Sequence, residues 1–515
     1  MTDRWANSTS SSTAAAPGAT GLDVHVALDP QHKTDSLEAA LRERIRDGRL
    51  AAGTRMPATR GLAADLGIAR NSVAEVYNRL LGEGWLEART GAGTWVAATA
   101  GAAAAGPGSA EDARQRDRTR EGRPSAAARL DLRAGIPDTS AFPRSAWASA
   151  MRRALTSATV VEFGYGEPAG VGALRRALAE YLGRARGVVA DMQTVHVTHG
   201  AGHAVRLLGA ALAARGVRRV AVEEYGHAQH RDILRSAGLE IVTVPVDDAG
   251  AQIERLDDVR ADAVLLTPAH QFPTGVLLAP ARRAAVVQWA ERTGSLVIED
   301  DYDGEFRFDR RAVGALQSLS PDHVAYVGTA SKSLGPAVGL GWCVLPRSLV
   351  TPVAEERRRD GANPGALAQL ALAEFLARGD YDRAVRGARA RYRARRRYLE
   401  SAVEQRMPAA RLSGMPAGLH CLLELPDGIR EEDVAAHAAA AGLTFTGLAT
   451  FRADEDDRVR AGGRAGTEGR THRPAMVVGF GAPPAHRFEE TVSVALTAIE
   501  SCGPRPAPPD RATSQ

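Results

Sequence analysis

The stretch Tyr326–Gly335, which reads YVGTASKSLG, decides the fold of the large part of this chain. The apolar residues that lead into it predict a buried strand over Val324–Gly328, and the small-residue turn that follows carries Lys332. A second predicted strand, upstream of this one, ends in an acidic cluster that contains Asp300 and Tyr302. If the two strands share a sheet, their ends bring a lysine, a carboxylate and a phenol together.

These three side chains suit a Schiff-base cofactor. A lysine amine can form an imine with pyridoxal 5′-phosphate (PLP). An aspartate can pair with the pyridinium nitrogen of that cofactor, and a phenol can hydrogen-bond its ring oxygen. A lone lysine would indicate only a solvated surface charge. The combination leads us to interpret Lys332, Asp300 and Tyr302 as a catalytic-type group and to expect PLP as the cofactor.

Strands and helices alternate from about residue 131 to residue 501, which predicts an α/β fold with a mostly parallel central sheet. One predicted strand, Val195–Thr198, leads through Gly200 and Ala201 into a helix, whose first N–H groups can hold a phosphate. A long basic helix is predicted over Tyr381–Arg406. It is either a second nucleic-acid surface or, as we favour, a solvated helix that connects two subdomains.

The N-terminal part has a different pattern. Apolar residues at helical spacing predict helices over Ser36–Asp47, Thr59–Asp65 and Arg70–Glu83. Alternation then predicts two short strands, Trp85–Arg89 and Thr94–Ala97, around a glycine-rich tip. Three helices followed by a hairpin predict a winged helix-turn-helix, whose third helix enters the major groove of DNA.

Several polar residues of this part are candidates for contact with double-stranded DNA. Arg70 and Asn71 suit the reading of guanine and adenine, and the hairpin residues Arg89 and Thr90 suit phosphate or the minor groove. The alternative is a small helical domain whose arginines are merely solvated. The candidate DNA-binding residues are Arg60, Arg70, Asn71, Ser72, Arg89, Thr90, Gly91 and Gly93.

Length and composition set the remaining limits. The 515 residues are 44% hydrophobic, so we expect folded domains at 31–97 and 131–502, a disordered N-terminus at 1–30, a flexible linker at 98–130 and a disordered tail at 503–515. The three cysteines are far apart, which predicts neither a disulfide framework nor a metal site. No apolar run is long enough for a membrane span, and a cytoplasmic location is expected. The net charge of +4 permits DNA binding without demanding it.

These motifs carry a resemblance to known families. Residues 36–97 resemble the DNA-binding domain of the GntR family, through Gly48–Pro57, Arg60–Ala63, Arg70–Ala74 and Gly91–Val96. Residues 131–500 resemble fold-type I PLP enzymes of the aminotransferase class I/II group. The matching stretches are Phe163–Gly170, Pro268–Gly275, Ile298–Phe306 and Gly328–Lys332. Together the two parts resemble a MocR-type regulator, a winged helix joined to an aminotransferase-like domain.

The resemblance implies roles for individual residues. Lys332 would carry the Schiff base, Asp300 would pair with the pyridine nitrogen, and Tyr302 would bond the ring hydroxyl. The family also implies a homodimer, head-to-tail in arrangement, that reads paired half-sites on DNA and responds to a small-molecule effector. The other cofactor-binding residues would be Gly200, Ala201, Thr329 and Ser331 at the phosphate, His227 at the ring-stacking position, and Tyr165 from the partner subunit.

The sequence also departs from the family pattern. Gly339 stands where an arginine usually neutralises the phosphate, and Val477 stands where an arginine usually grips a substrate carboxylate. His227 replaces the usual stacking tyrosine, and Gly202 and His203 replace the usual amides. In the N-terminal part, Ala69 replaces the serine that usually precedes the reading arginine, so either a helix cap or a phosphate contact is lost.

Three interpretations of the large domain are compatible with this pattern. In the favoured one, PLP binds through Lys332 and the domain senses PLP or a PLP-reactive amine, so that the protein is a PLP-dependent transcriptional regulator and any transaminase activity is vestigial. In the second, the domain has lost PLP and serves dimerisation or binds another ligand. In the third, it is a working aminotransferase, which the missing carboxylate arginine and the attached DNA-binding domain disfavour.

Overall fold

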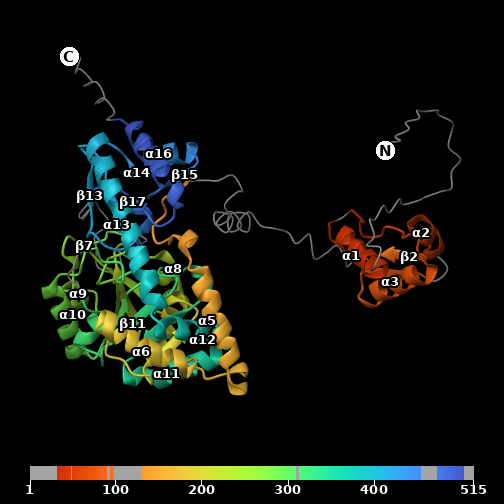
Figure 1. Cartoon of the computed structure of the whole chain (residues 1–515), viewed down its shortest axis with the longest axis horizontal. Helices are drawn as coiled ribbons and strands as arrows, with labels where there is room; N and C mark the ends of the chain where they lie inside the picture. Colours follow the sequence, from red (N-terminus) through yellow and green to blue (C-terminus); the bar gives the residue numbers. More distant parts are fainter. Residues whose placement is uncertain are drawn as a thin grey trace, which may run out of the picture. The chain divides into compact units, whose positions relative to one another are not determined.

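The computed structural model describes residues 32–47, 49–89, 93–97, 130–308, 313–453 and 473–503. The chain divides into two compact units, Met1–Pro124 and Ser125–Gln515, of which Figure 1 shows the elements. The segments expected to be disordered at 1–30, nearly all of the linker at 98–130, and the tail beyond residue 503 lie outside the described residues.

The N-terminal unit has the predicted order of three helices and a hairpin. Leu86 of the first strand lies opposite Val96 of the second in an antiparallel pair. Gly67 takes a left-handed conformation (φ 61°) between the second and third helices, which lets the chain turn sharply there. The elements are α1 (Lys33–Arg46), α2 (Thr59–Leu66), α3 (Arg70–Gly82), β1 (Leu86–Arg89) and β2 (Gly93–Val96).

One apolar core holds this unit together. Leu37 and Leu41 of α1 pack with Val73, Val76 and Leu80 of α3, and all five side chains are fully buried. Their spacing of three or four residues puts them on one face of each helix. Several polar residues of α3, among them Arg70, Asn71 and Asn78, stay exposed to solvent.

The large unit is built on a seven-stranded sheet in the order β4-β12-β11-β10-β9-β5-β6. Neighbouring strands from β11 to β6 are parallel, while β12 is antiparallel to both β11 and β4. The mostly parallel sheet is therefore as predicted. The strands are β4 (Val195–Thr198), β5 (Arg219–Glu223), β6 (Glu240–Val244), β9 (Ala263–Leu266), β10 (Leu296–Asp300), β11 (Val324–Thr329) and β12 (Gly341–Val344).

Helices cover both faces of this sheet. Along β5, Val220 and Val222 point into a cluster with helices α7, α8 and α11, whereas Ala221 points into a second cluster with α9 and α10. A strand buried on both faces has an apolar centre, as Val220, Ala221 and Val222 provide in β5. The helices of this part are α5 (Arg144–Ser157), α6 (Gly172–Arg186), α7 (Ala201–Ala214), α8 (Ala228–Ser236), α9 (Arg255–Asp258), α10 (Pro280–Thr293), α11 (Arg347–Asp360) and α12 (Ala366–Ala377).

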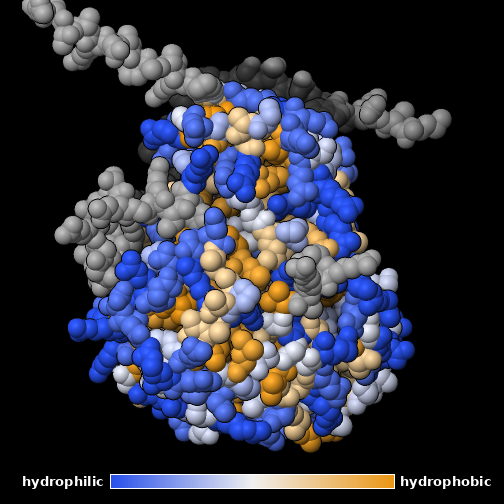
Figure 2. Space-filling view, turned by 90° about the vertical axis from the view of Figure 1, so that its left-hand side faces the viewer, coloured by the Kyte–Doolittle hydropathy of each residue, from blue (hydrophilic) through white to orange (hydrophobic). Residues whose placement is uncertain are grey.

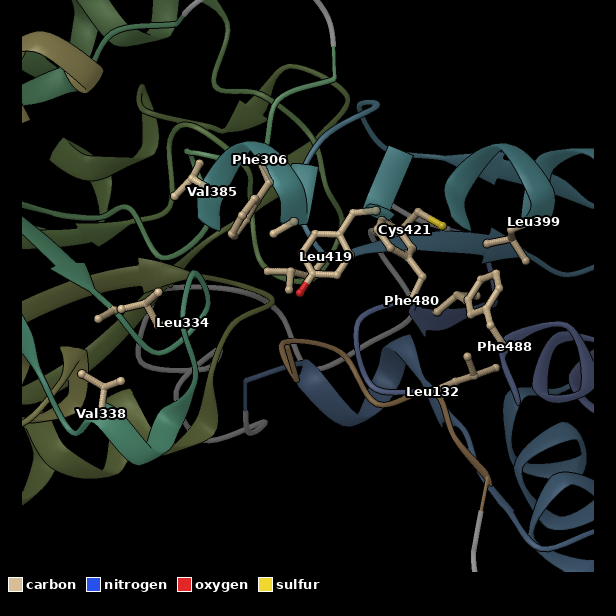
Figure 3. Close-up of a cluster of buried hydrophobic side chains, with 14 of the residues drawn as sticks. Leu132, Phe306, Leu334, Val338, Val385, Leu399, Leu419, Cys421, Phe480 and Phe488 are labelled. Atoms are coloured by element: carbon tan, nitrogen blue, oxygen red, sulfur yellow. The ribbon is translucent and has the colours of Figure 1, made fainter. Parts of the chain in front are cut away.

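A smaller α+β part completes the large unit. Its four-stranded sheet has the order β13-β14-β17-β16, and two helices pack against each other beside it. In Figure 3, Leu132, Leu419, Phe480 and Phe488 lie in the buried cluster that joins this part to the rest of the unit. The elements are β13 (Arg411–Ser413), β14 (His420–Glu424), α14 (Glu431–Ala440), β16 (Thr446–Gly447), β17 (Ala475–Gly479) and α16 (Phe488–Glu500).

The long basic helix connects the two parts of the large unit, but it is less solvated than expected. It is α13 (Asp380–Arg406), and its apolar stripe includes the buried Tyr392 and Leu399. Two of its arginines are buried as well. Arg395 bonds the Asp138 carboxylate at 3.1 Å and the Phe480 carbonyl at 2.9 Å. These arginines hold the α+β part in place and do not form a free basic surface.

Among the described residues, no helix combines the length and the apolar character that crossing a bilayer requires. Figure 2 shows one face of the molecule, on which polar residues dominate the margins and apolar residues gather toward the middle. Apolar surface of this kind is ordinary for folded proteins, so a binding role for any patch needs further support.

Candidate functional site

A cavity of about 840 Å³ opens at the carboxyl ends of the parallel strands in the large unit. Ligands of open α/β sheets bind at this edge, because neighbouring strand ends and helix starts converge there. The cavity brings together every cofactor-site residue expected from this chain except Tyr165, which would come from a partner subunit. The lining includes Gly200, Ala201, His227, Asp300, Tyr302, Thr329, Ser331 and Lys332.

Lys332 follows β11 and sits with its amine largely out of water. Burial lowers the pKa of this amine, and the nearby carboxylates of Asp300 and Asp303 only partly offset that effect. A lowered pKa increases the fraction of neutral amine at pH 7, which is the form that attacks an aldehyde.

Asp300, at the end of β10, has the buried and incompletely satisfied carboxylate that a cationic ring nitrogen needs. Its Oδ2 lies 3.6 Å from Nδ1 of His230, while its Oδ1 is buried without a hydrogen-bond partner among the described residues. Burial, and then the charge of Asp301, raise the pKa of Asp300 to about 7. A protonated pyridine nitrogen would supply the missing donor and favour the ionised carboxylate. The residues present therefore fit PLP.

Two stacked imidazoles form one wall of the cavity. The rings of His227 and His230 are 5.1 Å apart at an interplanar angle of 25°, and His227 also stacks on Phe272 at 5.8 Å. Burial lowers the pKa of both histidines, that of His230 to about 3, so both are neutral at pH 7. His227 thus offers the flat, uncharged face expected of it. His230 was not predicted as a site residue. It follows His227 by three residues, in the first turn of α8, so the two rings lie on the same side of that helix.

Tyr302 is held by a buried polar group behind the cavity. Its hydroxyl donates to the His270 carbonyl at 3.1 Å, and Nδ1 of His270 lies 2.9 Å from Oδ2 of Asp303. Burial raises the pKa of Tyr302 well above its ordinary value, so the phenol stays a neutral donor. His270, Asp303 and His420 were not predicted. Their donor atoms lie within 4.8 Å of one another, an arrangement that could hold a metal ion, and all three are buried.

The start of α7 forms another wall. Gly200 precedes the helix in a conformation with φ 109°, and no side chain caps the first turn, so its N–H groups face the cavity region. On the β11 side, Ser331 N–H donates to Thr329 Oγ1 at 3.1 Å. Three further residues line this end and were not predicted as site residues: His203, Arg206 and Asp360.

The two positions that lack the family arginines lie outside the cavity lining. Gly339 has φ 66° and ends a short turn, and a Cβ atom added there would meet nothing within 4 Å. Val477 of β17 is buried in an apolar cluster with Tyr225, Leu422 and Leu448. Neither position brings charge to the site. Tyr165 is fully exposed and away from the cavity lining, so its role across a subunit interface stays a prediction.

In the N-terminal unit, the predicted reading residues lie at the exposed start of α3. Arg70 and Asn71 are exposed and Ser72 is half-buried, while Arg60 is exposed on α2. Ala69 is the N-cap of α3 and provides no side-chain hydrogen bond, which confirms the expected loss of a cap. Of the remaining candidates, Arg89 ends β1 and Gly93 begins β2, whereas Thr90 and Gly91 lie outside the described residues.

Comparison with protein families matches both units. Residues 33–96 match the family of bacterial regulatory proteins of the gntR type, and residues 129–455 match aminotransferase class I and II. The chain is 31% identical over 504 residues to the probable rhizopine catabolism regulatory protein MocR of Rhizobium meliloti, covering 94% of this chain and 97% of that protein. It is 32% identical over 435 residues to the pyridoxine biosynthesis transcriptional regulator PdxR of Corynebacterium glutamicum, covering 83% and 91% of the two chains.

Solved structures show the same fold for the large unit. The α-aminoadipate aminotransferase LysN of Thermus thermophilus superimposes with a TM-score of 0.62 at 21% identity, covering 73% of this chain and 93% of that one. The kynurenine aminotransferase of Pyrococcus horikoshii superimposes with a TM-score of 0.64 at 20% identity, covering 77% and 95%.

Proposed function

This chain belongs to the MocR-type subfamily of the GntR family of DNA-binding transcriptional regulators, and we propose that it controls promoter binding through PLP held at Lys332. The supporting observation is the pairing of a low-pKa Lys332 with an unsatisfied Asp300 in one cavity, in a chain that also carries a winged helix-turn-helix. PLP, when bound, supplies an aldehyde that condenses with primary amines and a ring that withdraws electrons.

Different residues around the cavity would contact different parts of PLP. Lys332 provides the neutral amine, and Asp300 accepts from the ring nitrogen. Tyr302 donates its own proton to the His270 carbonyl, so its oxygen is left to accept a hydrogen bond from the ring hydroxyl. His227 covers one face of the ring, and the first turn of α7 offers N–H groups to the phosphate.

The effector we propose is PLP itself or a primary amine that is not held by an α-carboxylate. Position 477, outside the cavity lining, carries a buried valine and supplies no cation for a carboxylate, while Tyr225 and Phe272 bring aromatic surface to the cavity itself. An unpaired carboxylate would be poorly accommodated beside such a wall. Relatives named for rhizopine catabolism and pyridoxine biosynthesis make catabolic or pyridoxine-biosynthesis genes candidate targets.

We further propose that the protein acts in the cytoplasm as a head-to-tail homodimer. A segment of the large unit, Val160–Tyr165, supports this, because it leaves Val160 89% and Val161 81% exposed. Two copies of α3 would read paired half-sites on DNA, and an effector that binds one arrangement of the dimer better than another would shift the population toward it.

Reductive labelling tests the site directly, because the chain contains only two lysines, Lys33 and Lys332. We expect the full-length protein to take up PLP with a visible absorbance band, and borohydride to fix the label on the peptide that contains Lys332. Lys332→Ala should lose both the band and the label, whereas Lys33→Ala should keep them.

The alternatives give different results in the same experiment. A protein that shows no band and no label with excess PLP would be the PLP-free scaffold and would refute the cofactor proposal. Steady conversion of an amine donor and a keto acid would instead identify a working aminotransferase.

A further inference from the structure

We propose that Arg206 binds the phosphate of PLP in place of the arginine that is absent at position 339. This inference rests on the proposed function and adds a residue to the cofactor site. A phosphate dianion held by helix N–H groups is stabilised further by a cation within a few ångströms.

Few cations are available at the cavity. Among the described residues that line it, the arginine and lysine side chains are Lys332, Arg231 and Arg206. Lys332 is required as the amine that reacts with the aldehyde. Arg231 is buried and donates to the Gly226 carbonyl at 3.2 Å and to the Arg452 carbonyl at 3.3 Å. Arg206 is the remaining candidate.

Arg206 lies on the helix whose first turn would receive the phosphate. It follows Gly202 by four residues, so the two positions are neighbours on one face of α7. Side chains of an α-helix lean toward its N-terminus, which directs Arg206 toward the uncapped first turn. Its side chain is 42% exposed and lines the cavity, so it can move without disturbing a packed core.

The present partner of Arg206 is Asp360, the last residue of α11. The guanidinium forms an ion pair with Oδ1 of Asp360. Oδ2 of the same carboxylate lies 2.8 Å from Nε2 of His203, whose Nδ1 accepts from the His199 N–H at 3.1 Å. This arrangement makes Nε2 the protonated nitrogen and leaves His203 neutral, so it adds no positive charge at the phosphate end.

Asp360 therefore competes with a phosphate for Arg206. A carboxylate at this end also repels the dianion, so the pair would hold PLP more loosely than an unopposed arginine. A second feature of the same cavity points independently to a bound ligand, because the buried Oδ1 of Asp300 has no partner among the described residues. The site thus offers an acceptor at one end and an adjustable cation at the other.

The test compares PLP with pyridoxal, which has the same ring and aldehyde but no phosphate. The full-length protein is titrated with each aldehyde, and the absorbance band gives two dissociation constants and their ratio. We expect Arg206→Ala to reduce the preference for PLP by about tenfold or more and to leave pyridoxal binding little changed. Asp360→Asn should change the preference in the opposite direction, because it removes the competing charge. Arg215→Ala, which alters an exposed arginine just beyond the C-terminal end of α7, should leave the ratio as in the wild type.

Each outcome bears on a different claim. If the wild type prefers PLP and Arg206→Ala keeps that preference, Arg206 is not the phosphate cation, although the proposed function survives. Weakening of both aldehydes by Arg206→Ala in equal measure would assign it a structural role and would also overturn the inference. If the wild type forms no band with either aldehyde, both the proposed function and the inference fail.

Discussion

At the residue scale, the use of lysine is the most informative feature of this chain. Of 65 basic residues counted as Lys plus Arg, only Lys33 and Lys332 are lysines. Arginine cannot lose its proton in a protein, whereas a buried lysine readily does. The only lysine among the described residues of the large unit, Lys332, lines the cavity, where burial lowers the pKa of its amine.

The raised pKa of Asp300 predicts how the free energy of unfolding depends on pH. Its pKa is raised to about 7 in the folded protein, mainly by burial, from an ordinary value of 3.8. Between these values the unfolded chain releases the proton while the folded protein retains it. Asp300 thus favours folding most at low pH, and this contribution is lost as the pH rises through the folded pKa.

We therefore expect Asp300→Asn to stabilise the PLP-free protein near pH 8, by at most about 4 kcal/mol, and to change its stability little below about pH 4. The same variant should bind PLP weakly, because it removes the charged acceptor. Urea unfolding at the two pH values measures the difference, with the exposed Asp248→Asn as control. An equal effect at both pH values would show that ionisation of Asp300 is not the cause.

At the scale of single elements, helix α3 of the N-terminal unit has a buried apolar face and an exposed first turn with the predicted DNA-contacting residues. Its buried face holds Val73, Val76 and Leu80 in the core, while Arg70 and Asn71 stand exposed in the first turn. The N-cap, Ala69, offers no side-chain bond to that turn. The end of the helix that we predict to read bases is thus held without a side-chain cap.

Replacing Arg70 tests the reading role. We expect Arg70→Ala to weaken binding to the protein's operator DNA by about 1–3 kcal/mol and to relax the choice of base at one position. Electrophoretic mobility or fluorescence titration with single-base operator variants measures both effects. Arg292→Ala removes an exposed arginine from the large unit and should change neither. Loss of affinity that is uniform across all operator variants would reassign Arg70 to phosphate contact.

At the scale of the whole molecule, the exposed apolar segment Val160–Tyr165 is the feature that a single chain does not explain. Tyr165 is fully exposed, and Phe163 is exposed as well. The segment packs beside α12, where Leu367 is also exposed. Contiguous apolar surface of this kind marks interaction sites, and symmetric dimers use the same patch on both subunits.

A charge placed in this segment should separate the subunits. We expect Val161→Asp to weaken the dimer at least about tenfold, because a two-fold interface would bury two like charges. Sedimentation equilibrium gives the dimer dissociation constant. Val189→Asp, at another exposed valine of the large unit, serves as the control. A dimer unchanged by Val161→Asp would place the interface elsewhere.

Much of this architecture could be predicted because it is local in sequence. Apolar patterns predicted β4 with its observed bounds and α3 to within a residue. The acidic cluster with Asp300 and the small-residue turn with Lys332 indicated where β10 and β11 end. The buried arginines of α13 were not anticipated, since polar composition alone indicates solvent, and only packing against Asp138 and Phe480 withdraws Arg395 from it.

The sequence by itself determined which chemistry this protein carries: a lysine, a carboxylate and a phenol at strand ends, joined to a winged helix. Only the tertiary structure decided what surrounds them. His203 and Asp360 lie 157 residues apart in the chain, and Tyr302 and His270 lie 32 apart, yet each pair meets through hydrogen bonds at the cavity. A local sequence pattern cannot predict such pairs, because they form only when the packing of separate helices and strands brings their ends together.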